Sequence, residues 1–208
     1  MAIEDIFEAV LTFNKVAVAE GVKAELDAGT EIDSILNEAL IGALDVVGKK
    51  FSEGEMFVPE MLQAAKAMKA GLEVLKPYLR SESVASKGTV IIGTVKGDQH
   101  DIGKNLVAMM IEGAGFEVVD LGVNVDADKF VKAISEHNAG VLCLSALLTT
   151  TMPAMENAVA VIKKSGLAVK TIIGGAPVTV TFADQVGADG YSDDAPSAVE
   201  LVRKLMAT

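Results

Sequence analysis

The residues best suited to chemistry are an aspartate and a histidine separated by one residue, Asp98 and His100, which lie between Gly97 and Gly103. A neutral imidazole binds a metal through one ring nitrogen, and a carboxylate that accepts a hydrogen bond from the other nitrogen makes the imidazole a better ligand. The flanking glycines allow the backbone to approach a large flat group, because a Cβ there would collide with it. We therefore expect a cofactor or metal site at His100, with Asp98 as the partner of the imidazole.

This stretch lies where a strand is expected to turn into a helix. Residues 89–92 are apolar and rich in β-branched side chains, as in a buried strand, and residues 106–111 continue as an apolar helix. In open α/β sheets, ligands bind in the crevice beyond the carboxyl ends of the strands. The expected topology thus places His100 where a cofactor would bind.

Three other interpretations of the same stretch stay open. A phosphate loop needs four residues between its glycines and Ser or Thr after its lysine, whereas here five residues intervene and Asn105 follows the lysine. A hard-cation site could use Asp98 and Asp101, although one short turn does not supply the six or more oxygens that such ions require. The third interpretation is a capped helix start that holds a hydrogen-bonded histidine and no ligand.

Two later strand ends also carry unusual residues. Residues 145–152 follow an apolar strand-like run and contain four hydroxyl side chains. Residues 174–177 follow the next run and form a turn of small residues, which leaves an open slot beside the sheet. Since ligands bind at the carboxyl ends of the strands, both segments should border the crevice that contains His100.

The first 84 residues are expected to be helical, because apolar residues recur there at spacings of three and four. The helical segments are residues 4–11, 16–26, 32–47 and 59–79. Gly48 and the loop after it should end the third segment, and the last one has the seam of an antiparallel bundle. Residues 81–88 have the polar composition of a linker. We therefore expect a helical bundle domain at 1–84 and a second domain at 89–208.

The pattern after residue 88 alternates between strands and helices. The strand-like runs are residues 89–95, 116–121, 140–144, 169–173 and a short run near Gly190. Helical stretches between them require crossover connections, and hence a parallel sheet with helices on both faces. Five strands favour the flavodoxin-like order. The expected fold class is α/β, with an N-terminal helical bundle as a cap, followed by a Rossmann-like five-stranded parallel sheet domain.

Composition narrows the function classes. The net charge of −11 argues against a nucleic-acid partner and against an anionic membrane surface, since both need concentrated positive charge. No apolar run approaches a membrane span, and the N-terminus is acidic where a signal peptide would be basic, so we expect a cytoplasmic protein. The one cysteine, Cys143, lies in an apolar run and is expected in the core rather than in catalysis.

Three short motifs occur in order on the expected second domain: Asp98-x-His100-x-x-Gly103, Ser145-x-Leu147 and Gly174-Gly175. Together with the preceding bundle, including its residues 51–59, they resemble the corrinoid-binding proteins of methylamine and methanol methyltransferase systems, and they are similar to the cobalamin module of methionine synthase. The likeness covers nearly the whole chain. It implies that the cofactor is a corrinoid, cobalamin or a related cobamide, with its cobalt.

The resemblance assigns roles to the central residues. His100 is then the lower axial ligand of cobalt and displaces the cofactor's own nucleotide base, which threads as a tail into the sheet. Asp98 is the hydrogen-bond partner of His100, and Thr151, at a place where relatives can have serine, completes the relay as the third member of the catalytic set. Phe57 of the bundle resembles the apolar cap over the upper, methyl-bearing face.

Further cofactor contacts follow from the same resemblance. Ser145, Leu147 and Thr149 would line the channel for the tail, and Gly174 and Gly175 would leave it room. The full cofactor-binding set that the resemblance implies is Phe57, Gly97, Asp98, Gln99, His100, Asp101, Ile102, Gly103, Ser145, Leu147, Thr149, Gly174, Gly175 and Tyr191, the last of which could instead serve packing.

The function implied by the resemblance is that of a methyl carrier. A substrate-specific methyltransferase would place a methyl group on cobalt, and a second methyltransferase would pass it to a pterin or thiol acceptor. A reductive activator protein is the third expected partner. The alternatives are a corrinoid-dependent sensor, the small subunit of a carbon-skeleton mutase, and a flavodoxin-like binding or signalling domain without a corrinoid.

Overall fold

The computed structural model describes residues 2–79 and 87–207. The chain divides into two compact units, the first made of Met1–Ser86 and Glu112–Gly115 and the second of Lys87–Ile111 and Phe116–Thr208. The expected linker, residues 81–88, lies outside the described residues except for Lys87 and Gly88. The expected domain boundary at residue 84 lies outside them as well.

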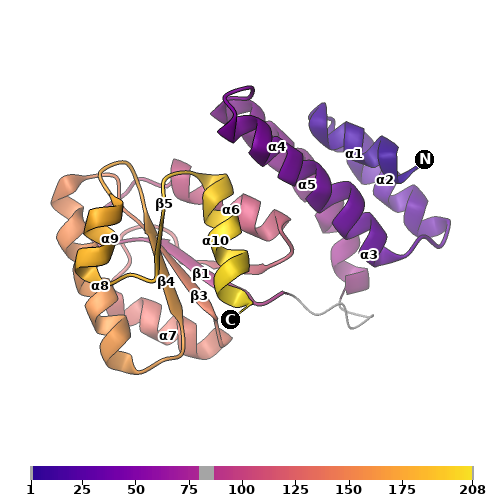
Figure 1. Ribbon diagram of the computed structural model, residues 1–208. Helices are drawn as coiled ribbons and strands as arrows, with labels where there is room; N and C mark the ends of the chain where they lie inside the picture. Colours follow the sequence, from indigo (N-terminus) through magenta and orange to yellow (C-terminus); the bar gives the residue numbers. More distant parts are fainter. Residues whose placement is uncertain (1, 80–86, 208) are drawn as a thin grey trace. The chain divides into compact units, whose positions relative to one another are not determined.

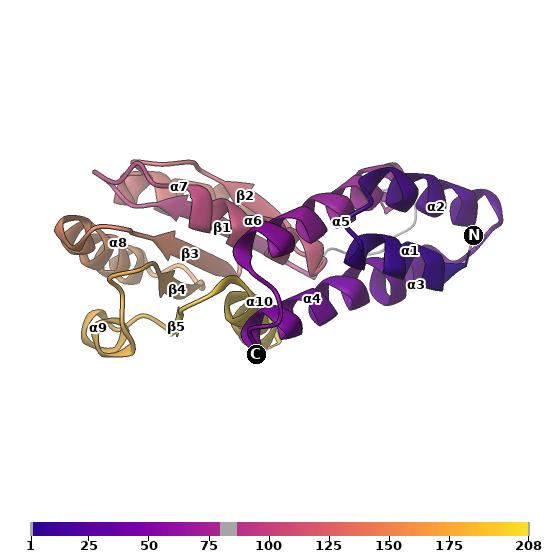
Figure 2. The same ribbon diagram turned by 90° about the horizontal axis from the view of Figure 1, so that it is seen from above.

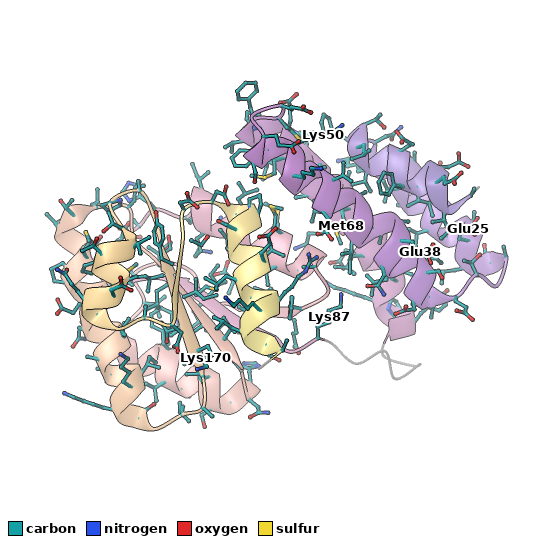
Figure 3. All side chains as sticks on the ribbon, viewed as in Figure 1. Glu25, Glu38, Lys50, Met68, Lys87 and Lys170 are labelled. Atoms are coloured by element: carbon teal, nitrogen blue, oxygen red, sulfur yellow. The ribbon has the colours of Figure 1, made fainter. Side chains whose placement is uncertain are left out.

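The first unit is helical (Figure 1). Its elements are α1 (Ile3–Leu11), α2 (Lys15–Asp27), α3 (Ile32–Ser34), the π-helix η1 (Ile35–Ile41), α4 (Gly42–Ser52) and α5 (Val58–Leu79). The apolar seam expected on α5 is buried at Met61, Ala65, Met68, Leu72 and Leu75. Met68, which is labelled in Figure 3, belongs to the apolar core of this unit. The first part of the chain therefore forms the expected helical domain.

The third helical segment departs from the expectation that it ends at Gly48. It begins at Ile32, passes through the π-helix and continues through Gly48 to Ser52 without a break. Gly48 is buried inside α4, so tertiary packing outweighs the low helix propensity of glycine. The wider turns of the π-helix were not expected either, because its buried apolar residues fit the spacing of an ordinary helix.

The second unit is an α/β domain. Its elements are β1 (Thr89–Thr94), α6 (Ile102–Gly113), β2 (Glu117–Asp120), α7 (Ala127–His137), β3 (Val141–Ser145), the short 3₁₀ turn η2 (Thr149–Thr151), α8 (Met152–Ser165), β4 (Lys170–Gly174), α9 (Val180–Val186), β5 (Gly190–Ser192) and α10 (Ala195–Met206). All neighbouring strands are parallel, in the order β2-β1-β3-β4-β5. This is the five-stranded Rossmann-like sheet that the alternating pattern predicted.

Helices cover both faces of this sheet. Figure 2 shows α7, α8 and α9 on one side of the strands and α6 and α10 on the other. The core on the α7–α9 side joins strand residues such as Ile91 and Leu142 to Phe130 of α7 and Met155 of α8. Central strands that are buried on both faces read as continuous apolar runs, which explains why β1 and β3 were recognisable in the sequence.

The strand order places the loop after β1 beside the loop after β3. β1 and β3 are neighbours at the centre of the sheet, although α6, β2 and α7 separate them in the chain. The connection after β1 leads through α6 to one edge of the sheet, and the connection after β3 leads through α8 toward the other edge. Such a reversal leaves a crevice between the two loops at the carboxyl ends of the strands.

Two expectations from composition concern the described residues. Cys143 is buried on β3, and burial raises the pKa of its thiol to about 12, so it is a protonated core side chain. Within residues 2–79 and 87–207, no helix has the length and apolar character needed to cross a membrane. The cytoplasmic location stays a prediction.

The turn after β4 is shaped by close packing of the backbone. Gly175 has a φ of +126°, and a Cβ there would collide with the carbonyl oxygen of Ala146. A Cβ on Gly174 would lie 2.7 Å from the carbonyl oxygen of Ser192. The protein's own strand ends therefore require both glycines, whatever else occupies the slot beside them.

We expect Gly175→Ala to destabilise the protein by roughly 3 kcal/mol, because it combines a backbone collision with a φ that side chains disfavour. Gly166→Ala is the matched control, since Gly166 has a φ of +70° but no atom within 4 Å of an added Cβ. The control should cost only about 1 kcal/mol. Urea denaturation gives both values, and equal losses would contradict the collision at Ala146.

Candidate functional site

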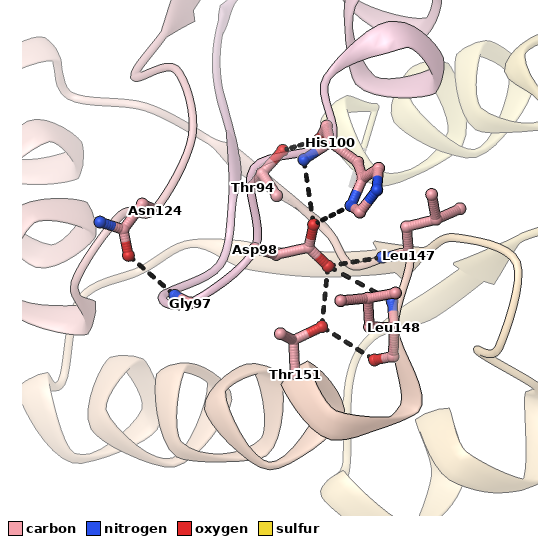
Figure 4. A network of polar contacts seen from close by, with 8 residues as sticks. All are labelled: Thr94, Gly97, Asp98, His100, Asn124, Leu147, Leu148 and Thr151. Carbon is pink, nitrogen blue, oxygen red and sulfur yellow. Dashed lines mark hydrogen bonds and ion pairs between the residues drawn. The ribbon is translucent and has the colours of Figure 1, made fainter.

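The side chain of Asp98 is the centre of the site. It lies in the loop after β1, is fully buried, and accepts hydrogen bonds through both carboxylate oxygens (Figure 4). Oδ1 accepts from the backbone N–H of His100 at 3.0 Å and contacts its Nδ1 at 2.7 Å. Oδ2 accepts from the backbone N–H groups of Leu147 at 2.8 Å and Leu148 at 3.3 Å, and from the Thr151 hydroxyl at 2.8 Å. One carboxylate therefore joins the loop after β1 to the loop after β3.

The hydrogen bonds keep this carboxylate ionised. Burial by itself would raise the pKa of Asp98, because the charged form loses contact with water. The donors from His100, Leu147 and Thr151 outweigh that effect and hold the pKa well below its ordinary value. At neutral pH, Asp98 is thus a negative acceptor and cannot serve as an acid.

The orientation of His100 follows from its two anchors. Its carbonyl oxygen accepts a hydrogen bond from the hydroxyl of Thr94 at 2.9 Å, and its ring is held by Asp98. An ionised carboxylate favours the tautomer with the proton on Nδ1, which leaves the lone pair of Nε2 for a ligand. The side chain is 50% exposed, so a ligand can approach it from solvent.

The donor set does not build a metal site from protein side chains. Within the part of the chain that the structure describes, no three His, Cys, Asp or Glu side chains are grouped to hold an ion. Asp101 is exposed and accepts a hydrogen bond from Asn105 at 3.0 Å, while Asp98 is occupied by its donors. The hard-cation interpretation therefore has no support. A single imidazole instead suits a metal that brings its other ligands in a macrocycle.

The phosphate-loop interpretation also lacks its cation. The side chain of Lys104 is 1% exposed, and its ammonium lies 2.5 Å from Asp120 Oδ2 and 2.6 Å from Asn105 Oδ1. A phosphate-loop lysine must instead point its ammonium toward the phosphates. Lys104 joins the first turn of α6 to the end of β2, which is a structural role.

The surface beside His100 is apolar and open. Ile102 is 78% exposed, and Leu147 and Leu148 are 43% and 42% exposed. A Cβ on Gly103 would meet no atom within 4 Å, so packing within the chain does not explain this glycine. Exposed apolar side chains that cluster around one polar group mark a binding surface. This arrangement fits the face of a large, mainly apolar ring with a metal at its centre.

The other expected site residues divide into three groups. Gly97, Gln99 and Thr149 are exposed near the central residues, and Gly97 has a φ of +84°. Ser145 ends β3, and its carbonyl oxygen accepts a hydrogen bond from Val95. Gly174, which ends β4, and Gly175, which follows it, are required by backbone packing, as described above.

Two further expected residues, Tyr191 and Phe57, belong to other segments of the chain. Tyr191 on β5 packs against the core of the second unit, which is the packing alternative considered for it. Phe57 belongs to the first unit, where it is exposed just before α5 and donates its N–H to Glu60 at 2.9 Å. Within the second unit, the structure thus brings together the residues of the loops after β1 and β3.

Sequence reasoning missed two residues that hold the loop. Thr94 fixes the backbone of His100, as described. Asn124 accepts a hydrogen bond from the Gly97 N–H through Oδ1 at 2.8 Å (Figure 4). Its own N–H donates to the carbonyl oxygen of Asp98 at 3.0 Å. The only available signal was that Asn124 follows β2, whose carboxyl end lies at the same edge of the sheet.

Comparisons with known proteins identify related sequences along the whole chain. Two family models, each described as a B12 binding domain, match residues 88–200 and residues 2–76. Dimethylamine corrinoid protein 1 of Methanosarcina acetivorans is 41% identical over 211 residues, which cover 99% of this chain and 97% of the relative. Trimethylamine corrinoid protein 1 of the same organism is 39% identical over 203 residues, covering 96% and 94%.

Solved structures give the same grouping. A chain of the methanol:cobalamin methyltransferase complex of Methanosarcina barkeri matches with a TM-score of 0.86 and 31% identity, covering 99% of this chain and 79% of that chain. A cobalamin-binding protein of Desulfitobacterium hafniense matches with a TM-score of 0.81 and 30% identity, covering 99% and 98%.

The lowered pKa of Asp98 predicts a pH dependence of stability. The unfolded chain takes up a proton near pH 3.8, whereas the folded chain resists it, so stability rises with pH through this region. The contribution of Asp98 is complete above about pH 5 and is lost as the pH falls toward its folded pKa. Urea denaturation at several pH values between about pH 5 and pH 2 gives the free energy of unfolding as a function of pH. This free energy should change less steeply with pH for Asp98→Asn than for the wild type.

The matched control is Asp128→Asn, which removes one negative charge from the exposed side of α7. It should retain the steep slope of the wild type over the same pH range. The assignment fails if Asp98→Asn and the wild type lose stability in parallel.

Proposed function

Because this chain belongs to the family of corrinoid proteins with B12-binding domains, we propose that it carries a methyl group on the cobalt of its corrinoid between two methyltransferases. The observation that carries this proposal is the contact between Asp98 and the Nδ1 of His100 at 2.7 Å, which leaves Nε2 for cobalt. The corrinoid, when bound, supplies a cobalt that accepts a methyl group and yields it to an acceptor.

In this proposal, the protein residues hold and orient the metal. His100 would hold the cobalt through Nε2, and Asp98 would keep the ring in the tautomer that presents this nitrogen. The single hydroxyl proton of Thr151 is shared between Asp98 Oδ2 and the Leu148 carbonyl oxygen, each 2.8 Å from Thr151 Oγ1, so Thr151 anchors the carboxylate to the loop after β3. The ionised carboxylate strengthens the imidazole as a ligand, since it stabilises positive charge that ligation draws onto the ring.

The remaining residues contact the cofactor in the same proposal. Residues 97–103 would contact the corrinoid, and the exposed Ile102 would offer it apolar surface. Ser145, Leu147 and Thr149 border the channel for the nucleotide tail. Phe57 would cap the corrinoid, so the two domains, residues 1–84 and 89–208, are part of the proposal as well.

The partners are proposed from the relatives. The names of these relatives refer to dimethylamine, trimethylamine and methanol, which supports a small methylated amine or alcohol as the methyl donor. A substrate-specific methyltransferase would deliver the methyl group. A second methyltransferase would pass it to a pterin or thiol. A reductive activator protein would return the cobalt to its reduced state after adventitious oxidation.

The ligand role of His100 can be tested by spectroscopy. Protein reconstituted with cobalamin should give the absorbance spectrum of a corrinoid that has released its own base and binds histidine, and its cob(II)alamin form should give the matching electron paramagnetic resonance spectrum. His100→Ala should lose the histidine signature. His137→Ala is the matched control, because His137 is the second histidine and lies exposed at the end of α7. An unchanged spectrum for His100→Ala would refute the assignment.

The carrier function can be tested separately. The reduced, reconstituted protein is mixed with each methyl donor, trimethylamine, dimethylamine or methanol, and with the methyltransferase specific for that donor. One pair should convert the cobalt spectrum to that of the methylated form within the assay. If every pair leaves the spectrum unchanged while the histidine signature is present, the protein binds a corrinoid but is not this carrier.

A further inference from the structure

We propose that Asn124 is a positioning residue, which holds the loop after β1 so that His100 is presented to the cobalt in one orientation. The proposal rests on the proposed corrinoid ligation by His100 and adds a residue outside the Asp98, His100 and Thr151 group. Asn124 lies between β2 and α7, in a third loop at the carboxyl edge of the sheet. It does not need to contact the cofactor.

Asn124 holds the loop at two points. Its Oδ1 accepts from the Gly97 N–H at 2.8 Å (Figure 4). Its own backbone N–H donates to the Asp98 carbonyl oxygen at 3.0 Å. These two contacts fix the backbone immediately before and at Asp98. Because Asp98 in turn binds both the backbone and the ring of His100, Asn124 acts on the imidazole through Asp98.

The loop needs such a restraint. Gly97 has a φ of +84°, a region that glycine enters freely and from which it can as readily leave. Among the hydrogen bonds of the described residues, the one that the Gly97 N–H makes is to the side chain of Asn124. Without that bond, the peptide before Asp98 gains freedom, and the direction of the carboxylate becomes less defined.

The backbone on either side of Asn124 is itself hydrogen-bonded to the end of β1. Val125 donates its N–H to the Thr94 carbonyl at 3.0 Å and pairs with Val95 in an isolated parallel bridge. The segment is also held upstream, where Gly122 accepts from the Thr94 N–H at 2.9 Å. A side chain mounted on a segment that is bonded to the end of β1 can fix a neighbouring loop precisely.

The residue type fits its backbone. Asn124 has a φ of +54°, in the left-handed region that asparagine tolerates better than most residues other than glycine. Asparagine therefore supplies an acceptor at a position where few side chains can sit. Its side chain is exposed, so removing the amide leaves the core intact.

The test separates the side-chain acceptor from the backbone conformation. Asn124→Gly keeps the left-handed backbone and removes Oδ1, whereas Asn124→Asp keeps an acceptor oxygen. Asn138→Gly is the matched control, because Asn138 has a φ of +49° at the end of α7, before the start of β3 and away from the carboxyl edge. Each full-length variant is titrated with hydroxocobalamin, and its cob(II)alamin form is examined by electron paramagnetic resonance for the histidine signature.

We expect Asn124→Gly to raise the Kd for hydroxocobalamin about five- to tenfold, as for the loss of one restraining hydrogen bond. It should also lower the fraction of cob(II)alamin that shows histidine ligation. Asn124→Asp should stay within about twofold of the wild type, since it keeps the acceptor. Asn138→Gly should match the wild type in both measurements.

Three results would overturn the inference. Asn124→Gly could match the wild type in affinity and spectrum, or Asn124→Asp could be as impaired as Asn124→Gly. The third is a loss of stability of the cofactor-free Asn124→Gly protein that exceeds the loss for Asn138→Gly, which would make the role structural. If the wild type itself lacks the histidine signature, the proposed function fails first, so the two failures are distinguishable.

Discussion

A buried negative charge is the constraint on which the second unit depends. The carboxylate of Asp98 is removed from water, and an isolated ion in that position would be strongly unfavourable. Its donors come from the backbone of two loops, one imidazole and one hydroxyl. The loops after β1 and β3 therefore take the shapes that satisfy this ion. The orientation of His100, and with it the chemistry of the site, follows from that requirement.

The parts of this arrangement differ in how far the sequence reveals them. Asp98 and His100 are two residues apart, so their contact could be expected from local spacing alone. Thr151 is 53 residues from Asp98, and nothing in its neighbourhood indicates that its hydroxyl reaches the carboxylate. Its assignment came from the pattern of a family. Local chemistry can predict a contact within one turn, whereas a contact across strands depends on the register of the sheet.

The fold was predictable where burial is periodic. The runs that became β1 and β3 are buried on both faces, and the seam on α5 recurs at three and four residues. The π-helix at Ile35–Ile41 was not predictable, because its apolar residues satisfy ordinary helical spacing equally well. The pair Gly174 and Gly175 was recognised, but the backbone collisions that demand glycine depend on how closely β3, β4 and β5 end. The role of Asn124 depends on the bridge between Val95 and Val125, which no pattern marks.

The distance in sequence between the donors of Asp98 bears on when the site can exist during folding. Leu147 and Thr151 lie 49 and 53 residues after the carboxylate, and α6, β2, α7 and β3 must be made before they can reach it. A nascent chain that ends before residue 147 lacks both donors, and one that ends before residue 151 still lacks the hydroxyl. The hydrogen-bonded setting of Asp98 is consequently completed late in synthesis, only in chains long enough for the central strands to pair.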